Sequence, residues 1–205
     1  NRLLLASTSP YRRALLKQVG IVASSCQTNC DEESVRAESP SLLAAARSEA
    51  KGLSLASVPD ACLVLSADQV LEFEGKDYGK ANTAKEACDR IRSFSGKLHQ
   101  LHSAYTLLHY DPARSIRQIL CTRVITAQMH MRVLSEEEIQ AYVATGEWQG
   151  CAGCYQYENQ GMQLFEKVDG GMSTIIGLPL PELLKDLRLL GISPLLSPAG
   201  PWTLI

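Results

Sequence analysis

The chain has 205 residues, of which 45% are hydrophobic and 20% are charged, and its formal net charge is −2. This length is enough to bury a sizeable core, so we expect one domain over residues 1–205. The small net charge provides no general basic field for nucleic acid, and no apolar run approaches the roughly 20 residues of a membrane span. Neither nucleic acid nor a membrane is therefore an expected partner.

The cysteine content favours a reducing compartment. The chain has seven cysteines, an odd number, and its first residues lack the pattern of a secretory signal. We therefore expect reduced thiols and a cytoplasmic location.

The first strand and helix of the chain predict an anion site. An apolar strand pattern at Leu3–Ala6 leads through a turn of small residues into a helical pattern. Ser9 suits the N-cap and Pro10 the first helical position. Arg12 and Arg13 then fall in the first turn, where the helix dipole disfavours each cation by roughly 0.3–1 kcal/mol. Free helix N–H groups beside two guanidinium groups indicate a site for phosphate.

Strand and helix patterns alternate along the rest of the chain. We expect strands at 21–26, 62–65, 98–110 and 117–131, another between a break at 66–68 and a turn at 75–76, and paired strands over 151–168. We expect helices at 41–57, 83–94, 135–145 and 179–190, two of them begun by capping boxes at Thr83 and Ser135. The tail after residue 192 is expected to be loosely held. These patterns predict one α/β unit with a mixed sheet.

Acidic and basic residues along this pattern suit metal-assisted phosphate chemistry. Asp68 follows an apolar strand, Glu32 lies in an acidic loop, Lys51 lies on the long helix and Lys80 follows a turn. Carboxylates hold Mg²⁺ or Mn²⁺ and position water, while basic groups offset charge on phosphate oxygens. Exposed lysines and a solvated acidic loop are the simpler interpretation, but a carboxylate after an apolar strand needs a partner. No Walker A motif occurs, which argues against a P-loop kinase or GTPase.

Two other groups of residues have less support as sites. Cys151 and Cys154 have the C-x-x-C spacing of thiol oxidoreductases, but the pair comes late in the chain and in a β-like stretch. A zinc site would need a second pair of ligands, so small core residues are the favoured interpretation. His99 and His102 are expected to point sideways or outward on a strand, without a catalytic role.

Several longer stretches together resemble the Maf family of septum-formation-type nucleoside triphosphate pyrophosphatases. They are LLLASTSPYRRALLKQVGI, CDE, LSADQVLEFEGKDYGK, SFSGKLHQLHSAYTLL, CAGCYQYENQGMQLFEKVDGGMSTIIGLPL and LLKDLRLLGI, in the family's order. The resemblance implies an elongated α/β fold related to the inosine triphosphate pyrophosphatases, with two lobes flanking a cleft. It also implies hydrolysis of a nucleoside triphosphate to the monophosphate and pyrophosphate, a divalent cation (Mg, Mn or Co) and a possible homodimer.

The resemblance also implies site residues. By position, the family's site residues correspond to Ser7, Arg12, Glu32, Lys51, Asp68, Lys80 and Glu158. Asp68 matches the aspartate usually taken as the proton acceptor, and with Glu32 it would hold the cation. Arg13 is retained as a second substrate-binding arginine.

Departures from the common family pattern bear on the substrate. Tyr11 stands where the common turn has proline, and Glu158 where many members have glutamine, as in the branch that acts on 7-methyl-GTP. A methylated guanine is cationic, so an aromatic ring and a carboxylate are suitable partners. Tyr11 fits a packing role equally well. The alternatives are a UTP- or dTTP-type pyrophosphatase and a nucleotide-binding regulator of cell division with little turnover.

Overall fold

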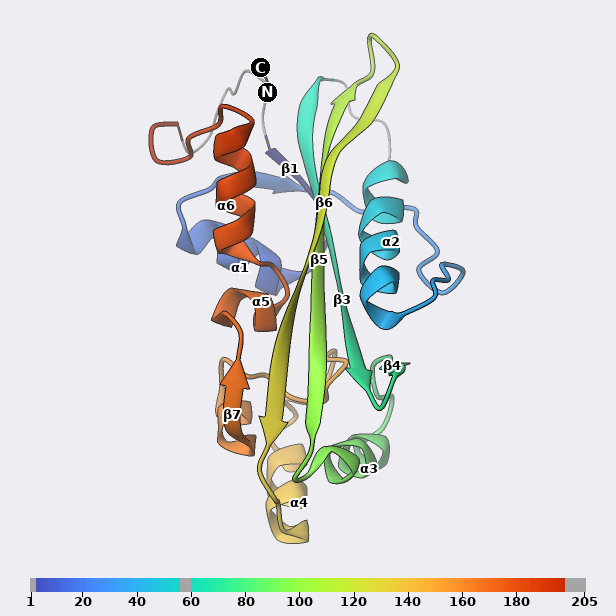
Figure 1. Ribbon diagram of the computed structural model, residues 1–205, viewed down its shortest axis with the longest axis vertical. Coiled ribbons are helices and arrows are strands. Elements are labelled where there is room, and N and C mark those ends of the chain that lie inside the picture. Colours follow the sequence, from blue (N-terminus) through green and yellow to red (C-terminus); the bar gives the residue numbers. More distant parts are fainter. Residues whose placement is uncertain (1–2, 56–59, 198–205) are drawn as a thin grey trace.

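The computed structural model describes residues 3–55 and 60–197, and these form an elongated mixed sheet with helices on both sides (Figure 1). The strands are β1 (Leu3–Ala6), β2 (Ala23–Ser25), β3 (Cys62–Phe73), β4 (Lys76–Tyr78), β5 (Leu98–Asp111), β6 (Ile116–Met131) and β7 (Phe165–Asp169). The helices are α1 (Pro10–Gln18), α2 (Pro40–Leu53), α3 (Ala84–Phe94), α4 (Glu136–Ala144), α5 (Met172–Ile176) and α6 (Leu180–Leu189), with a 3₁₀ turn η1 (Gln160–Leu164). The predicted fold class is confirmed.

Three long antiparallel strands set the length of the molecule. The sheet order is β2-β1-β3-β5-β6-β7, with β4 on β3; the β1–β2 and β1–β3 pairs are parallel and the other pairs of these strands are antiparallel. The 16 residues of β6 span roughly 50 Å at the usual rise per residue. Helices α1, α5 and α6 lie on one side of the sheet, and α2 and α3 lie on the other (Figure 1). Among the described residues, no helix has the length and apolar character needed to cross a bilayer.

The two larger core clusters correspond to the two expected lobes. One contains Phe94 and Tyr155 and lies around α3 and α4. The other contains Leu5 and Leu187 and lies around β1, α1 and α6. Strand β3 contributes Ala67 to the second cluster and Leu71 to the first. The stretch of β3 between these residues, which includes Asp68, therefore lies at the junction of the two cores.

The capping predictions are confirmed at Ser9 and Ser135 and in part at Thr83. The Ser9 hydroxyl accepts a hydrogen bond from the backbone N–H of Arg12, and proline follows as the first helical residue. Ser135 and Glu138 form both hydrogen bonds of the predicted capping box. At the start of α3, Thr83 caps as predicted. Its partner Glu86 instead accepts from the backbone N–H of Asn82, one residue earlier than a capping box requires.

The predicted break at 66–68 is wrong, because β3 continues without interruption from Cys62 to Phe73. Ser66 and Asp68 pair with Thr106 and Ala104 of β5. Asp68 therefore lies in the middle of a strand rather than at its end. Its polarity is explained by a partner on α2, not by a loop.

Several other predictions differ from the structure. The stretch 151–168 forms turns, η1 and one short strand instead of paired strands, and α5 had not been predicted. The helix expected at 41–57 is α2 and ends at Leu53, and the strand expected at 21–26 shortens to β2. The predicted orientation of the two histidines is wrong: His99 is 1% and His102 is 4% exposed. The last part of the tail, 198–205, lies outside the described residues.

Candidate functional site

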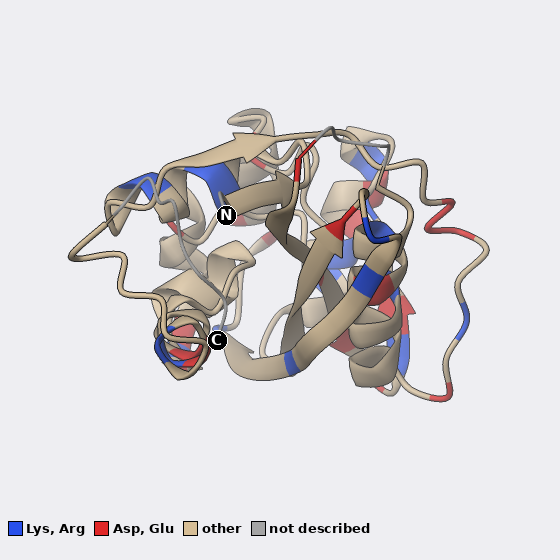
Figure 2. Cartoon of the chain, turned by 90° about the horizontal axis from the view of Figure 1, so that it is seen from above, with Lys and Arg blue, Asp and Glu red and all other residues tan. Residues whose placement is uncertain are grey.

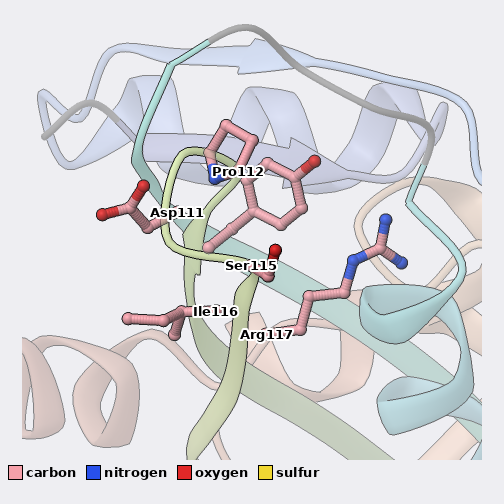
Figure 3. Close-up of a pocket in the computed structure, with 6 residues that line it drawn as sticks. Asp111, Pro112, Ser115, Ile116 and Arg117 are labelled. Atoms are coloured by element: carbon pink, nitrogen blue, oxygen red, sulfur yellow. The ribbon is translucent and has the colours of Figure 1, made fainter.

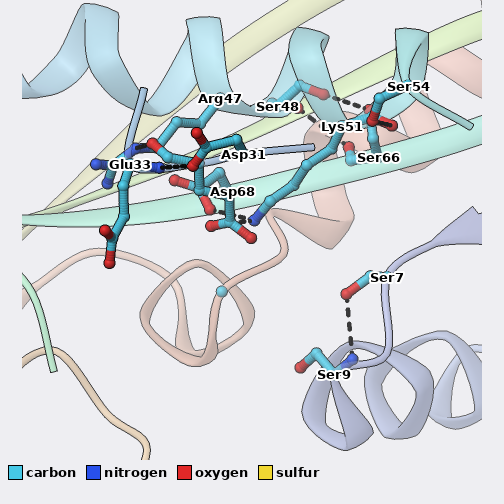
Figure 4. Close-up of polar contacts among 12 residues, drawn as sticks. Ser7, Ser9, Asp31, Glu33, Arg47, Ser48, Lys51, Ser54, Ser66 and Asp68 are labelled. Atoms are coloured by element: carbon cyan, nitrogen blue, oxygen red, sulfur yellow. Dashed lines mark hydrogen bonds and ion pairs between the residues drawn. The ribbon is translucent and has the colours of Figure 1, made fainter. Parts of the chain in front are cut away.

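An ammonium group between two carboxylates forms the centre of the candidate site. Lys51 Nζ lies 2.6 Å from Asp68 Oδ1 (Figure 4). The same atom lies 2.9 Å from Glu32 Oε2. Lys51 and Asp68 are buried, whereas the Glu32 side chain is 48% exposed. Side chains tilt toward the N-terminus of their helix, so Lys51, near the C-terminal end of α2, extends back toward the middle of β3. The structure thus brings three of the predicted site residues together.

Close packing of α2 on β3 holds this ion pair. The Ser66 hydroxyl donates to the carbonyl of Ser48 at 2.7 Å, and the Ser48 hydroxyl donates to the carbonyl of Ser66 at 3.2 Å. A Cβ atom on Gly52 would lie 2.4 Å from a Leu108 methyl carbon and 2.8 Å from the Ser66 hydroxyl. Glycine at position 52, next to Lys51, therefore allows the helix to approach the strand.

One oxygen of Asp68 remains available for chemistry. Asp68 Oδ2 is buried and has no hydrogen-bond partner within residues 3–55 and 60–197. An unsatisfied buried oxygen is costly, so this atom is suited to accept from water or to contact a cation. The described part of the chain contains no group of three or more His, Cys, Asp or Glu residues that could hold a metal by themselves. Asp68 and Glu32 nevertheless fit Mg²⁺, which proteins commonly hold with one or two carboxylates plus substrate phosphates.

The predicted anion-binding turn supplies a guanidinium group near these carboxylates. Arg12 Nε donates to the carbonyl of Gly177 at 3.1 Å, and Nη1 donates to the Ser7 hydroxyl at 3.3 Å. Burial lowers the pKa of Arg12, and the charges of Asp68 and Glu32 act in the opposite direction. Arg12 is therefore within electrostatic range of both carboxylates.

The second arginine of this turn is placed differently. Arg13 is exposed, and its side chain has no hydrogen bond or ion pair to the described residues. Its predicted contact with substrate stays a prediction.

Sequence reasoning missed the residues that anchor α5 beside Arg12. Gln69 Nε2 lies 2.8 Å from the Ser103 hydroxyl, 2.9 Å from the carbonyl of Ile175 and 3.1 Å from that of Thr174. Two residues later the backbone reaches Gly177, whose φ of 117° is accessible to glycine and strained for other residues. The Gly-Leu-Pro sequence after an apolar run was the only local signal for this turn.

The two residues proposed to read the base lie near each other. The pKa of Tyr11 is raised, mainly by burial and then by its electrostatic interactions with Cys151 and Glu158, and the side chain of Gln156 acts in the opposite direction, so these groups lie close to the Tyr11 hydroxyl. Tyr11 lies on α1, whereas Cys151, Gln156 and Glu158 belong to the segment before η1. Lys80 is exposed, and its charge lowers the pKa of Cys151, which places it on the side of this loop.

The properties of the C-x-x-C pair argue against a thiol oxidoreductase. Both thiols are free, and burial raises the pKa of Cys151 to about 11. A redox-active cysteine needs a lowered thiol pKa. The raised pKa of Cys151 agrees with reduced cysteines that have no redox role.

A pocket lies at the end of the β5–β6 hairpin (Figure 3). Its volume is about 440 Å³, and it is lined by Tyr110, Asp111, Pro112, Ser115, Ile116 and Arg117. Tyr110 is six residues along β5 from the partner of Asp68, a distance of roughly 20 Å. Asp111 accepts hydrogen bonds from the backbone of its own turn. None of the predicted site residues lines this pocket.

Charged residues of both signs are distributed along the chain. Figure 2, which views the molecule from above, shows Lys and Arg interspersed with Asp and Glu on the helices and loops. The electrostatic features of the candidate site are therefore local, as the net charge of −2 led us to expect.

Comparison with known proteins identifies the family. The family described as Maf-like protein matches residues 2–190, so the chain belongs to the Maf-like family, as predicted. It is 36% identical over 197 residues to a 7-methyl-GTP pyrophosphatase of Rhizobium meliloti (strain 1021), covering 92% of this chain and 96% of that protein. It is 40% identical over 198 residues to a 7-methyl-GTP pyrophosphatase of Bartonella quintana (strain Toulouse), covering 93% and 96%. It is also 40% identical over 181 residues to a nucleoside triphosphate pyrophosphatase of Prochlorococcus marinus (strain MIT 9313), covering 88% and 95%.

Proposed function

We propose that this protein is a nucleoside triphosphate pyrophosphatase. It adds water across the α–β phosphoanhydride and releases a nucleoside monophosphate and pyrophosphate. The observation that carries this proposal is the buried Lys51–Asp68 pair with an unsatisfied carboxylate oxygen, electrostatically coupled to Arg12. The names of the relatives, which cover most of the chain, support the same reaction.

Asp68 is the proposed general base. Lys51 donates to Oδ1 and leaves Oδ2 as the acceptor for a proton of the attacking water. The water oxygen bonds to the α-phosphorus, the bond from that phosphorus to the bridging oxygen breaks, and pyrophosphate leaves with the bonding electrons. Both products are free species, so no covalent enzyme intermediate is needed. General-base catalysis of this kind contributes typically 10²–10⁴-fold.

Basic and hydroxyl groups would bind the triphosphate. Arg12 and Ser7 lie at the N-terminus of α1, where the helix dipole favours phosphate. Lys80 adds a further positive charge from the other lobe. Phosphate bound by the guanidinium groups would offset their positive charge, which explains why arginine is tolerated at the unfavourable N-terminal end of a helix.

Glu32 and Asp68 are the proposed ligands of a divalent cation, Mg²⁺, Mn²⁺ or Co²⁺. Such a cation, when bound, offsets charge on the phosphate oxygens as a Lewis acid. Because the described residues place two carboxylates here, triphosphate oxygens would complete its coordination.

The proposed substrate is a nucleotide with a cationic base, such as 7-methyl-GTP. Tyr11 and Glu158 provide an aromatic ring and a carboxylate close to each other, a pair suited to a methylated guanine. A UTP- or dTTP-type preference is the alternative. The homodimer and the cytoplasmic location stay predictions.

The test is pyrophosphate release from 7-methyl-GTP, GTP, UTP and dTTP with Mg²⁺ or Mn²⁺. We expect turnover that falls by about 10²–10⁴-fold in Asp68→Asn, because the amide cannot act as the base. Near-full activity of this variant would refute the assignment of Asp68. Nucleotide binding without turnover in the wild type would instead favour the regulator of cell division, and a preference for UTP would refute the role of Tyr11 and Glu158.

A further inference from the structure

Two side chains outside the proposed catalytic group hold the loop that faces Tyr11. The hydroxyl of Tyr142, on α4, accepts a hydrogen bond from the backbone N–H of Gln156 at 3.0 Å and lies 3.2 Å from Glu147 Oε2, to which it donates. Glu147 also accepts from the backbone N–H groups of Gln160 and Gly161, at 3.3 and 3.2 Å. Tyr142 and Glu147 together thus satisfy three backbone N–H groups of the 156–161 loop.

The 156–161 loop is closed tightly around this pair. A Cβ atom on Gly161 would lie 2.4 Å from the carbonyl oxygen of Gln156 and 2.9 Å from the Tyr142 hydroxyl. The Asn159 side chain donates to the Gln156 side-chain oxygen at 2.8 Å. Tyr142 is 7% exposed, and burial is the main cause that raises its pKa, so its hydroxyl keeps the proton it donates to Glu147. The loop therefore has little room for another conformation.

The same loop is in contact with the other lobe. The Gln156 side chain lies close enough to the Tyr11 hydroxyl to lower its pKa, whereas burial, and to a smaller extent the charges of Glu158 and Glu147, raise it. The side-chain hydrogen bonds of Tyr142 and Glu147 go to this loop and to each other. A change in either residue should alter the position of Gln156 and Glu158 relative to Tyr11 and leave the Lys51–Asp68 pair in place.

We propose that Tyr142 and Glu147 are positioning residues for base selection, and that Gln156 is a further specificity-determining residue. This inference rests on the proposed function, because it concerns the base of the same nucleotide. Tyr142 and Glu147 hold the loop, and the loop presents Gln156 and Glu158 to the base beside Tyr11. The triphosphate groups are common to all nucleotides and are bound elsewhere, so the two positioning residues act on selectivity rather than on the chemical step.

The test compares kcat/KM for 7-methyl-GTP and UTP in the full-length protein. Tyr142→Phe removes one oxygen atom. In this variant we expect kcat/KM for 7-methyl-GTP divided by kcat/KM for UTP to fall about ten- to hundredfold toward one, since small displacements of positioning groups have effects of this size. The value of kcat at saturating UTP should stay within about threefold of wild type under the same reasoning. Gln156→Ala should lower the same ratio.

A matched control is available on the loop itself. The Tyr157 ring packs on Phe165, and its hydroxyl has no hydrogen bond to the described residues. Tyr157→Phe removes the same atom and should leave the ratio unchanged. Glu147→Gln is the second variant if Tyr142→Phe does not fold, and thermal unfolding of each variant identifies this case.

The remaining outcomes separate this inference from the proposed function. A selective wild type whose ratio is unchanged in Tyr142→Phe and Glu147→Gln would overturn the positioning role and leave the function intact. An equal loss of kcat for both nucleotides would also overturn it, since this is the result of a merely structural role. A wild type that hydrolyses both nucleotides equally would refute base selection alone, whereas one that hydrolyses neither would refute the proposed function as well.

Discussion

Replacing Lys51 by methionine should make the stability of this protein strongly dependent on pH. The methionine side chain has a similar length but lacks the charge that now lies 2.6 Å from Asp68. Breaking a buried ion pair by removing one partner costs about 3–5 kcal/mol, because the other charge stays buried. Glu32, whose side chain is 48% exposed, should add no more than about 1 kcal/mol. The expected loss is a large part of the 5–15 kcal/mol typical of a folded domain.

The sign of the pH dependence follows from the burial of Asp68. Without Lys51, desolvation should raise the pKa of the folded-state carboxyl above its value in the unfolded chain, about 4. The folded state then binds the proton more tightly, so the variant is least stable above the raised pKa and regains stability as the pH falls. The difference in unfolding free energy between wild type and Lys51→Met should therefore be larger at about pH 7.5 than at about pH 5.

Urea unfolding followed by circular dichroism measures this difference at both pH values. The double variant Lys51→Met/Asp68→Asn carries no buried charge at this position and should recover most of the lost free energy. Lys85→Met is the matched control, because Lys85 pairs with Asp89 at the surface and its side chain is 87% exposed. If Lys51→Met lost no more stability than Lys85→Met, or if the double variant recovered none, the buried ion pair would not be the cause.

Two further predictions concern the turn and the helix that flank the site. Arg12→Ala should raise the KM for nucleotide by about 10- to 100-fold and flatten its dependence on salt, since a charged hydrogen bond contributes about 1.5–3 kcal/mol. An unchanged KM in steady-state assays would contradict phosphate binding by Arg12. Arg13→Ala in the same assay measures the contribution of the second arginine. Gly52→Ala should cost about 1–3 kcal/mol of unfolding free energy, because the added Cβ would lie 2.4 Å from Leu108. Gly79→Ala, where no atom lies within 4 Å of the added Cβ, is its control in urea unfolding, and equal losses in the two variants would refute the close packing of α2 on β3.

Local signals in the sequence were sufficient where the cause of a structure lies within a few residues. The N-cap at Ser9 and the capping box of Ser135 with Glu138 are examples, since all their partners are at most three residues away. The sequence also proposed Glu32, Lys51 and Asp68 as site residues from a family pattern over nearly the whole chain, and the structure brings these three side chains together.

Two of the errors have the same physical cause: the partner of the residue lies on a distant element. Asp68 was interpreted as following a strand because it is charged, yet Lys51 of α2 satisfies it inside β3. His102 was expected to point outward, yet its ring nitrogens lie 2.7 Å from Glu72 Oε2 and 2.8 Å from the Thr126 hydroxyl. Sequence periodicity records only whether a position is polar, and a satisfied buried polar group has the same pattern as an exposed one.

By itself the sequence determined the family, most of the strands and helices and the helix N-caps, and it proposed a set of reactive side chains. Only the tertiary structure decided which of these side chains meet. The carbonyl of Gly177 holds Arg12 from 165 positions away, and the 156–161 loop brings Gln156 to Tyr11. Such contacts depend on the register of the sheet and on how helices pack against it. Propensity and periodicity act over a few residues and carry no information about these distances.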